Sequence, residues 1–362
     1  MLIIQLIILL ISALFISFSA LIYNKFKKLF ETPAEYHLES EFTIIVAAKN
    51  EAENIHKLII SLMEIDYSQH KMEVMLIDDN SEDDTLKIIE KEINSLENFK
   101  VYSLRGKKYS GKKGALSYGI ENSKFPLIFI TDADCIIEPN ILKSLSFKFG
   151  NGYDMLFGPS PFLEGKTFIN RMICFENLRN SILMFSSAGY GIPYSSTARN
   201  FAFKKSVFEK SNGFSRHSKI LSGDDDLLLQ SAVKNKFRIG VITDRQSFVY
   251  SETKKTFKEY LHQRARHTQT SFYYLPSRIF LLTLWHFLNL ILLFSPFLIF
   301  LNQWFFILFI VKLLTDLIIT TRLQKKFTYN FKLYEIILFQ IIYELMLIVN
   351  LVNAKFGRIK WK

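Results

Sequence analysis

The chain carries three clusters of acidic residues whose types and spacing could do chemistry. They are Asp78-Asp79-Asn80, Asp132-Ala133-Asp134 and Asp224-Asp225-Asp226, and the first two directly follow the apolar runs MEVMLI and LIFIT. Carboxylates this close together repel one another unless a positive charge lies between them. Because the clusters follow strand-like runs, we expect that positive partner to be a ligand or a metal ion.

The second cluster has the spacing of a metal site. Two carboxylates separated by one residue, as in Asp132 and Asp134, can both approach one hard cation. Mg²⁺ or Mn²⁺ in such sites keeps some of its waters and bridges substrate phosphates. The alternative is an Asx-type turn that leads into Glu138-Pro139-Asn140. The apolar strand before the pair favours metal binding, so we predict Asp132 and Asp134 as metal ligands.

The other two acidic clusters allow different interpretations. Asp78-Asp79-Asn80 could cap a helix that begins near Thr85, or could accept hydrogen bonds from a nucleotide base or ribose. Helix capping accounts for one acid of Gly223-Asp224-Asp225-Asp226, but hardly for three. A carboxylate held beside other acids keeps a raised proton affinity, which suits a general base.

Two basic segments accompany the acids. Gly111-Lys112-Lys113-Gly114 begins a helical stretch where lysines near free amides could hold a phosphate, although a P-loop has a different spacing. Solvated surface lysine is the alternative. In Gln263-Arg264-Ala265-Arg266-His267, Gln263 lies one helical turn from Arg266, and Arg offers a planar fork for diphosphate oxygens. Taken by itself, this segment is more typical of an interfacial helix that meets lipid headgroups.

Alternating strands and helices are expected to position these side chains. Apolar, partly β-branched runs predict strands at residues 43–48, 72–77, 100–104, 127–131 and 153–158, and helical patterns occupy residues 53–64 and 85–96. This order predicts an α/β fold with a Rossmann-like, mostly parallel sheet. Ligands bind beyond the carboxyl ends of the strands in such sheets, which is where the first two acidic clusters fall.

The ends of the chain are typical of a membrane protein. Residues 1–23 form an uncharged apolar run, followed by Lys25, Lys27 and Lys28, which predicts a retained transmembrane anchor whose carboxyl end is cytoplasmic. Hydrophobic residues make up 49% of the chain, Phe alone numbers 35, and the net charge is +11. That charge fits a surface beside the inner leaflet better than nucleic acid, because no nucleic-acid module signature is present. The two cysteines, Cys135 and Cys174, fit no metal or disulfide pattern.

Residues 279–294 and 297–320 predict a pair of membrane helices, broken at Ser295-Pro296. Residues 336–352 form a third candidate, which is more polar. If this third segment crossed the membrane, the basic residues Lys355, Arg358, Lys360 and Lys362 would lie outside the cell, against the positive-inside rule. The sequence leaves open whether the segment spans the membrane, re-enters it or lies at its interface.

Six motifs in order resemble the membrane-associated family 2 glycosyltransferases with a GT-A fold. They are IIVAAKNEAENI, LIDDNSEDDT, GKKGAL, ITDADC, SGDDDL and QRARH. The family includes cellulose, chitin and hyaluronan synthases and lipid-linked sugar transferases. The resemblance covers roughly residues 40 to 270, and the flanking membrane segments match the same group.

The resemblance implies a role for each matching residue. Ala47, Glu51 and Asp79 would border the uridine pocket, and Lys112 would lie near the phosphates. Asp132 and Asp134 match the metal-binding DxD motif, and Asp225 matches the catalytic base. Gln263 and Arg266 match the Gln and Arg of the QxxRW motif. His267 replaces the usual Trp of that last motif, which puts the acceptor-sugar platform and long-chain processivity in doubt.

The expected enzyme transfers a sugar with inversion from a UDP-sugar donor, using Mg²⁺ or Mn²⁺, to a membrane lipid or glycan acceptor. The expected location is a bacterial plasma membrane, with the catalytic domain cytoplasmic. The expected domains are an anchor (1–23), a GT-A domain (40–256), an interfacial amphipathic helix region (257–277) and carboxyl-terminal membrane helices (279–354). The alternatives are a processive polysaccharide synthase, a metal-dependent nucleotidyltransferase and a non-catalytic membrane scaffold.

Overall fold

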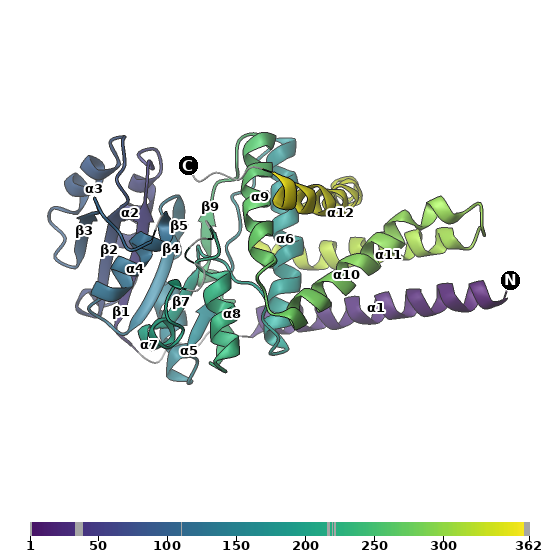
Figure 1. Ribbon diagram of the computed structural model, residues 1–362, viewed down its shortest axis with the longest axis horizontal. Helices are drawn as coiled ribbons and strands as arrows, with labels where there is room; N and C mark the ends of the chain where they lie inside the picture. Colours follow the sequence, from purple (N-terminus) through teal and green to yellow (C-terminus); the bar gives the residue numbers. More distant parts are fainter. Residues whose placement is uncertain are drawn as a thin grey trace. The chain divides into compact units, whose positions relative to one another are not determined.

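The computed structural model of the chain describes residues 2–32, 39–109, 111–215, 218, 220 and 222–357 (Figure 1). Arg358, Lys360 and Lys362, on which part of the topology expectation rests, lie outside the described residues. The chain divides into two compact units. Among the described residues, an α/β unit is formed by those within 32–163 and 193–252, and a helical unit by those within 2–31, 164–192 and 253–357.

The α/β unit is built on a seven-stranded sheet in the order β3-β2-β1-β4-β7-β6-β8. The strands are β1 (Phe42–Ala48), β2 (Met72–Asp78), β3 (Phe99–Ser103), β4 (Leu127–Asp132), β6 (Met155–Phe157), β7 (Phe201–Lys204) and β8 (Ile239–Val241). β1 lies parallel to β2 and β4, β2 is parallel to β3, and β7 runs antiparallel to β4 and β6. β5 (Cys135–Ile137) and β9 (Val249–Ser251) form a separate two-stranded sheet. The predicted α/β fold with a mostly parallel sheet is therefore confirmed.

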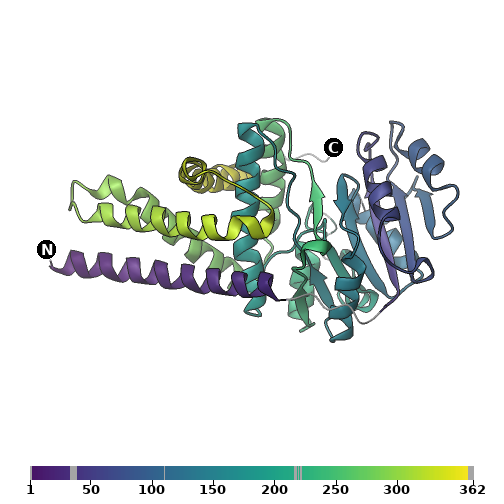
Figure 2. The ribbon, with the colours of Figure 1, turned by 180° about the vertical axis from the view of Figure 1, so that it is seen from behind.

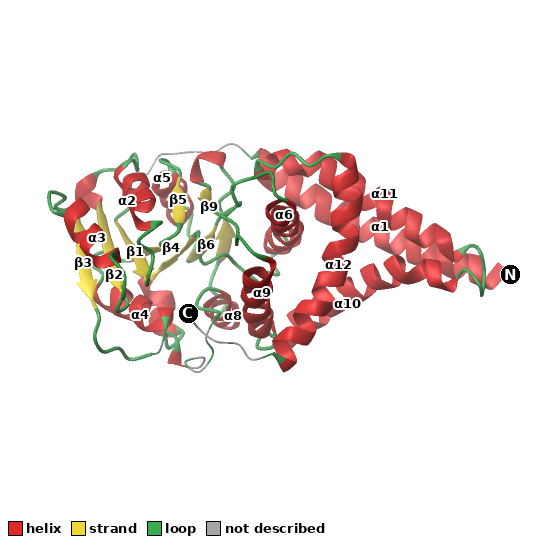
Figure 3. Ribbon diagram, turned by 90° about the horizontal axis from the view of Figure 1, so that it is seen from above, coloured by secondary structure: helices red, strands yellow, loops and turns green. Residues whose placement is uncertain are grey.

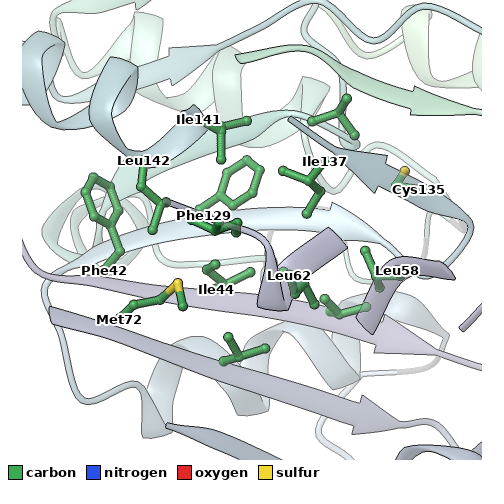
Figure 4. Close-up of a cluster of buried hydrophobic side chains, with 14 of the residues drawn as sticks. Phe42, Ile44, Leu58, Leu62, Met72, Phe129, Cys135, Ile137, Ile141 and Leu142 are labelled. Atoms are coloured by element: carbon green, nitrogen blue, oxygen red, sulfur yellow. The ribbon is translucent and has the colours of Figure 1, made fainter. Parts of the chain in front are cut away.

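Successive residues of a strand point to opposite faces of the sheet, so helices pack against it on both faces. The helices of this unit include α2 (Ile55–Met63), α3 (Thr85–Ile93), α4 (Lys112–Asn122), α5 (Ile141–Gly150), α7 (Lys205–Lys210) and α8 (Asp226–Lys234). Ile44 of β1 belongs to a buried cluster with Leu58 of α2 and Ile141 of α5 (Figure 4). Ile45, the next residue along β1, points to the other face and lies against α4.

Gly119 lets α4 approach the sheet closely. A Cβ atom at Gly119 would lie 2.6 Å from Cδ1 of Ile77 and 2.7 Å from Cγ2 of Ile45, both of which are fully buried. Neither side chain can move aside without disturbing a close-packed interior. The position of α4, and of the lysine at its start, therefore depends on the missing side chain at Gly119.

The helical unit contains the long apolar helices. Its helices are α1 (Leu2–Glu31), α6 (Phe168–Gly189), α9 (Phe257–Ser271), α10 (Pro276–Phe294), α11 (Phe305–Leu323) and α12 (Leu333–Phe356), with short 3-10 turns η4 (Ser295–Leu298) and η5 (Gln324–Phe327) (Figure 3). By length and composition, segments Leu2–Glu31, Pro276–Leu298 and Leu333–Phe356 could cross a membrane. α6 lies within the predicted 40–256 range but groups with this unit by its contacts. The predicted domain boundaries remain predictions.

Replacing Gly119 with Val should lower the free energy of unfolding by about 1–3 kcal/mol, the usual cost of overfilling a packed core. The matched control is Gly106→Val, because a Cβ there would meet nothing within 4 Å in the described part of the chain. Thermal unfolding of both purified variants in detergent measures the difference. Equal unfolding temperatures for the two variants would contradict the close α4–sheet contact.

Candidate active site

The carboxyl ends of three parallel strands bring the predicted residues to one edge of the sheet. Ala47 of β1 pairs in register with Ile77 of β2 on one side and with Asp132 of β4 on the other. The backbone amide of Asp79 donates a hydrogen bond of 2.8 Å to the carbonyl oxygen of Ala48. The first two acidic clusters therefore lie beside one another, although more than fifty residues separate them in the sequence.

Asp79 is buried and already has a cationic partner. The ammonium group of Lys107 contacts Oδ1 of Asp79 and lies 3.3 Å from the carbonyl oxygen of Gly111. Lys107 was not among the predicted site residues. The sequence does carry a signal for Lys107. It belongs to a basic segment that lies between the first two acidic clusters, so that an acidic, a basic and an acidic block follow one another along the chain.

The structure does not support the helix-cap interpretation of the first cluster. α3 begins at Thr85 with Asp84 as its N-cap residue, so Asp78 and Asp79 do not occupy the capping position. Asp78 accepts a hydrogen bond of 3.3 Å from the amide of Ser81 and so shapes the turn that follows β2. This leaves Asp79 as the carboxylate of the cluster that points to the basic segment.

Glu51 lies in the loop after β1. Its amide donates to Oγ1 of Thr85 at 2.8 Å, and its carboxylate accepts from the side-chain amide of Asn54 at 2.8 Å. The amide of Ala52 donates to Asp83 at 3.2 Å, which adds a second link to the loop after β2. These contacts hold the loops after β1 and β2 together beside Asp79.

Lys112, the first residue of α4, joins the second and third acidic clusters. Its ammonium nitrogen lies 2.5 Å from Oδ1 of Asp132 and 3.0 Å from Oδ2 of Asp224. Lys112 and Asp224 are mostly buried and Asp132 is partly exposed, so water screens their charges less than at the surface. Burial lowers the pKa of Lys112, but the two carboxylates outweigh it and raise that pKa above its usual value. Lys112 is therefore a permanent cation that draws two distant acidic clusters together.

The three acids before α8 have different environments. Asp224 pairs with Lys112; burial raises its pKa, but the lysine charge outweighs burial and the net pKa is lowered. Asp226 accepts hydrogen bonds from Oγ of Ser195 at 2.8 Å and from the amide of Ser196 at 2.9 Å. Asp225 is held between them, and burial followed by the charges of Asp226 and Asp224 raises its pKa well above the usual value. Asp225 thus has a greater affinity for a proton than Asp224.

The predicted metal ligands can be compared with what a divalent cation needs. Asp132 ends β4, and Asp134 lies in the turn before β5, with buried Ala133 between them. Among the residues that the structure describes, no group of three His, Cys, Asp or Glu side chains is placed to hold a metal ion by itself. Mg²⁺ is commonly held by one or two carboxylates together with substrate phosphates. The ammonium of Lys112 beside Asp132 shows that this carboxylate accepts a cation, so the donor set fits such a metal.

Gln263 and Arg266 lie on α9, in the helical unit. The helix is confirmed over Phe257–Ser271, so these two side chains are one turn apart as predicted. Arg264, between them, forms an ion pair of 2.8 Å with buried Glu176 of α6. The predicted site residues belong to two units: Gln263 and Arg266 to the helical unit, and Ala47, Glu51, Asp79, Lys112, Asp132, Asp134 and Asp225 to the α/β unit.

A parallel α/β sheet with acidic and basic side chains gathered at its carboxyl edge is the architecture of a nucleotide-binding protein. Residues 43–211 match the family model of Glycosyl transferase family 2. Residues 43–211 are therefore a family 2 glycosyltransferase domain.

Curated relatives and one solved structure resemble the chain. Beta-monoglucosyldiacylglycerol synthase of Trichormus variabilis is 32% identical over 118 residues, which are 31% of this chain and 25% of that protein. Poly(ribitol-phosphate) beta-N-acetylglucosaminyltransferase TarS of Staphylococcus aureus is 27% identical over 207 residues, 57% of this chain and 34% of that protein. The chain thus spans well under half the length of these two relatives. The mannosyltransferase PcManGT of Pyrobaculum calidifontis, solved with GDP-Man and Mn²⁺, superimposes on the chain with a TM-score of 0.61 at 17% sequence identity. The superposition covers 98% of this chain and 99% of that one, and it confirms the GT-A fold.

Replacing Lys112 with Met should lower the free energy of unfolding by about 3 kcal/mol, because two largely buried carboxylates lose their shared cation. The matched control is Lys108→Met, since Lys108 is mostly exposed where it meets Glu121 at 3.3 Å. Unfolding of both variants in detergent gives the comparison. A Lys112 variant as stable as the control would mean that the carboxylates do not depend on this ammonium.

Proposed function

We propose that the protein transfers a sugar with inversion from a UDP-sugar donor to a membrane lipid or glycan acceptor at the cytoplasmic face of the membrane. The observation that carries the proposal is the ion-paired arrangement of Asp132, Lys112 and Asp224. It supports one cleft that contains both the DxD motif and the acidic cluster of the predicted base. A scaffold without chemistry has no need to hold such mutually repelling groups together.

The proposed UDP-sugar donor is supported by the resemblance of the motifs. Asp79, with Ala47 and Glu51 on the adjoining strand end and loop, is proposed to border the uridine. Lys112 is proposed to face the diphosphate, since it already neutralises two anions at the start of a helix, where free amides favour phosphate. Gln263 and Arg266 keep the diphosphate-binding role that their motif implies.

Asp132 and Asp134 would hold Mg²⁺ or Mn²⁺ together with the donor phosphates, and the cation would neutralise the charge that develops on the leaving diphosphate. Lys112 would add a positive charge of the protein beside the leaving diphosphate. Lys112 is a fixed cation beside Asp132, so it needs no reorganisation when charge develops there.

Asp225 is proposed as the general base. The acceptor hydroxyl oxygen attacks the anomeric carbon of the sugar, its proton passes to the Asp225 carboxylate, and the bond to the diphosphate breaks with its electron pair leaving on UDP. The raised pKa of Asp225 suits this step, because a carboxylate of ordinary acidity would accept the proton less readily. Its neighbours Asp224 and Asp226 are committed to Lys112 and to Ser195.

The acceptor is supported by composition and by the relatives. In the described part of the chain, three helices are long and apolar enough to cross a membrane, which would bring a lipid to the enzyme. The names of two relatives describe a glucosyldiacylglycerol product and a poly(ribitol-phosphate) acceptor, one a lipid and one a polymer. His267 in place of the family's Trp favours a lipid or a short glycan over a long secreted polymer.

Replacing Asp225 with Asn should reduce turnover by about 10²-fold or more while leaving the donor affinity unchanged, because only proton transfer is lost. The unfolding temperature should not fall, since the buried site disfavours the ionised form of Asp225. The control is Asp226→Asn, which keeps the oxygen that accepts from Ser195 and Ser196. Near-normal turnover by Asp225→Asn, measured as UDP release, would rule out this base.

A donor screen tests the reaction itself. Purified enzyme with membrane lipid extract should release UDP from one UDP-sugar but not GDP from GDP-mannose. Release should stop when EDTA removes divalent cations and resume with Mg²⁺ or Mn²⁺, because carboxylate oxygens bind these hard ions. Release of pyrophosphate in place of UDP would indicate nucleotidyl transfer, and long polymer among the products would indicate a processive synthase.

A further inference from the structure

Composition and packing disagree about which helices cross the membrane. By composition, α12 qualifies as a span and α11 does not, because α11 carries Lys312, Asp316 and Arg322. α11 has 19 residues and is therefore about 28 Å long, close to the thickness of the hydrocarbon core. Its length allows a crossing if its charges are neutralised inside the protein.

The two central charges of α11 are neutralised. The ammonium of Lys312, fully buried, lies 2.9 Å from Asp316, 3.0 Å from Glu344 of α12 and 2.8 Å from the side-chain oxygen of Asn289 of α10. Asp316 also pairs with Arg179 of α6 at 2.8 Å. Two cations and two anions thus balance one another, which is how ionisable groups are tolerated within a bilayer. Charge therefore does not prevent α11 from crossing.

α11 runs alongside α1 and in the same direction (Figure 2). Leu308, in the first turn of α11, shares a buried cluster with Ile8 near the start of α1. At the opposite end, Lys326 of η5 pairs with Glu31 of α1 at 3.3 Å. α10 precedes α11 across the turn at residues 295–304, so α10 and α11 form a hairpin beside the predicted anchor. If α1 crosses the membrane, its lengthwise partner α11 crosses it too.

α12 runs crosswise to these helices. Figure 1 shows α12 nearly end-on, while α1 and α11 run lengthwise, and Figure 3 shows α12 from the side. Glu335 in its first turn pairs with Arg171 of α6, where Nη2 donates at 2.6 Å, and further along Tyr343 donates from its hydroxyl to Asn180 of α6 at 2.9 Å. α12 also packs along α9. A helix that followed α11 through the bilayer would leave α6 and α9 after its first turns.

The two faces of α12 have opposite character. The side chains of Glu335, Gln340 and Glu344 are buried in the helical unit. On the opposite side Leu338, Leu345 and Val352, spaced by sevens and so on one face, are exposed to 43%, 38% and 50%. The helix is flanked by Lys332 at its start and by Lys355 in its last turn, where long cationic side chains can reach headgroups from an apolar layer.

We propose that α12 lies in the plane of the membrane, with its Leu338–Leu345–Val352 face against the acyl chains of one leaflet, and that α1, α10 and α11 are the crossing helices. This inference rests on the proposed membrane location. The three crossings return the chain to the side where α1 ends, so Lys355 lies on the same side as Lys25, Lys27 and Lys28. The positive-inside rule, which a spanning α12 would violate, is then satisfied.

Spin labels along α12 test its orientation. Leu338→Cys, Leu345→Cys and Val352→Cys, each labelled in phospholipid vesicles, should report equal immersion depths by oxygen and nickel-chelate relaxation. A spanning helix would place the Leu345 label about 10 Å deeper than the Leu338 label, and this result would overturn the proposal. Native Cys135 and Cys174 are buried, so the unsubstituted chain serves as the labelling blank.

The matched control uses the same spacing on α1, at the exposed residues Leu2, Leu9 and Ile16. Their labels should differ in depth by about 10 Å from Leu2 to Leu9. A flat profile on α1 would show that the membrane assignment itself is wrong, whereas a gradient on both helices would overturn only the in-plane position of α12.

Labelling with a membrane-impermeant maleimide gives the side of the membrane. Lys355→Cys should react from the same side of sealed vesicles as Lys87→Cys, an exposed position on α3, and Gln303→Cys at the α10–α11 turn should react from the other side. Reaction of Lys355→Cys together with Gln303→Cys would contradict the proposal.

Discussion

The arrangement of the site depends on one cation held between two carboxylates. Asp132 and Asp224 are separated by more than ninety residues and would repel one another across a largely buried space. Lys112 lies within 3.0 Å of both, so the repulsion becomes a pair of attractions. That position requires α4 to start at the carboxyl edge of the sheet, and α4 can lie there because Gly119 has no side chain to hold it away from Ile45 and Ile77. The charge balance of the site therefore depends on the close packing of α4 against the sheet.

The same balance separates the roles of three consecutive aspartates. Asp224 turns to Lys112 and stays ionised, and Asp226 turns to Ser195 and Ser196 at the start of α8. Asp225 remains beside two charges of its own sign, which together with burial raises its pKa. The pKa of Asp225 is thus raised while Asp224 and Asp226 are paired with other groups. Family 2 glycosyltransferases need such a group at neutral pH, which is the basis of the proposed role of Asp225.

The helical unit also neutralises buried charges by pairing them with charges of opposite sign. Lys312 and Asp316 would exclude α11 from a bilayer if they were unpaired, and their partners come from α6, α10 and α12. Hydropathy and the number of charged residues take no account of such pairing. By these two properties α12 qualifies as a membrane span and α11 does not. Neutralisation by neighbouring helices reverses that ranking in the proposed topology.

Much of the fold follows from sequence pattern. The strands at residues 43–48, 72–77 and 127–131 and the helix start at Thr85 were predicted nearly to the residue, because apolar periodicity and β-branched residues act locally. The predicted strand at 153–158 is confirmed only over Met155–Phe157. Position at a strand end also identified Asp79, Asp132 and Asp134 as residues of one sheet edge, since parallel strands end together.

Other properties could not be derived from pattern because they depend on contacts between distant segments. The pairing of Lys107 with Asp79, the bridge from Lys112 to Asp224 and the neutral cluster around Lys312 each join residues from different elements. The sequence by itself determined the α/β class, the strand-end acids and the apolar helices, since each reflects the chemistry of neighbouring residues. Only the tertiary structure decided which acid of the third cluster has a raised pKa, which lysine neutralises which acid and in which direction α12 runs relative to α11, because electrostatic energy and packing depend on distance in space and not on separation along the chain.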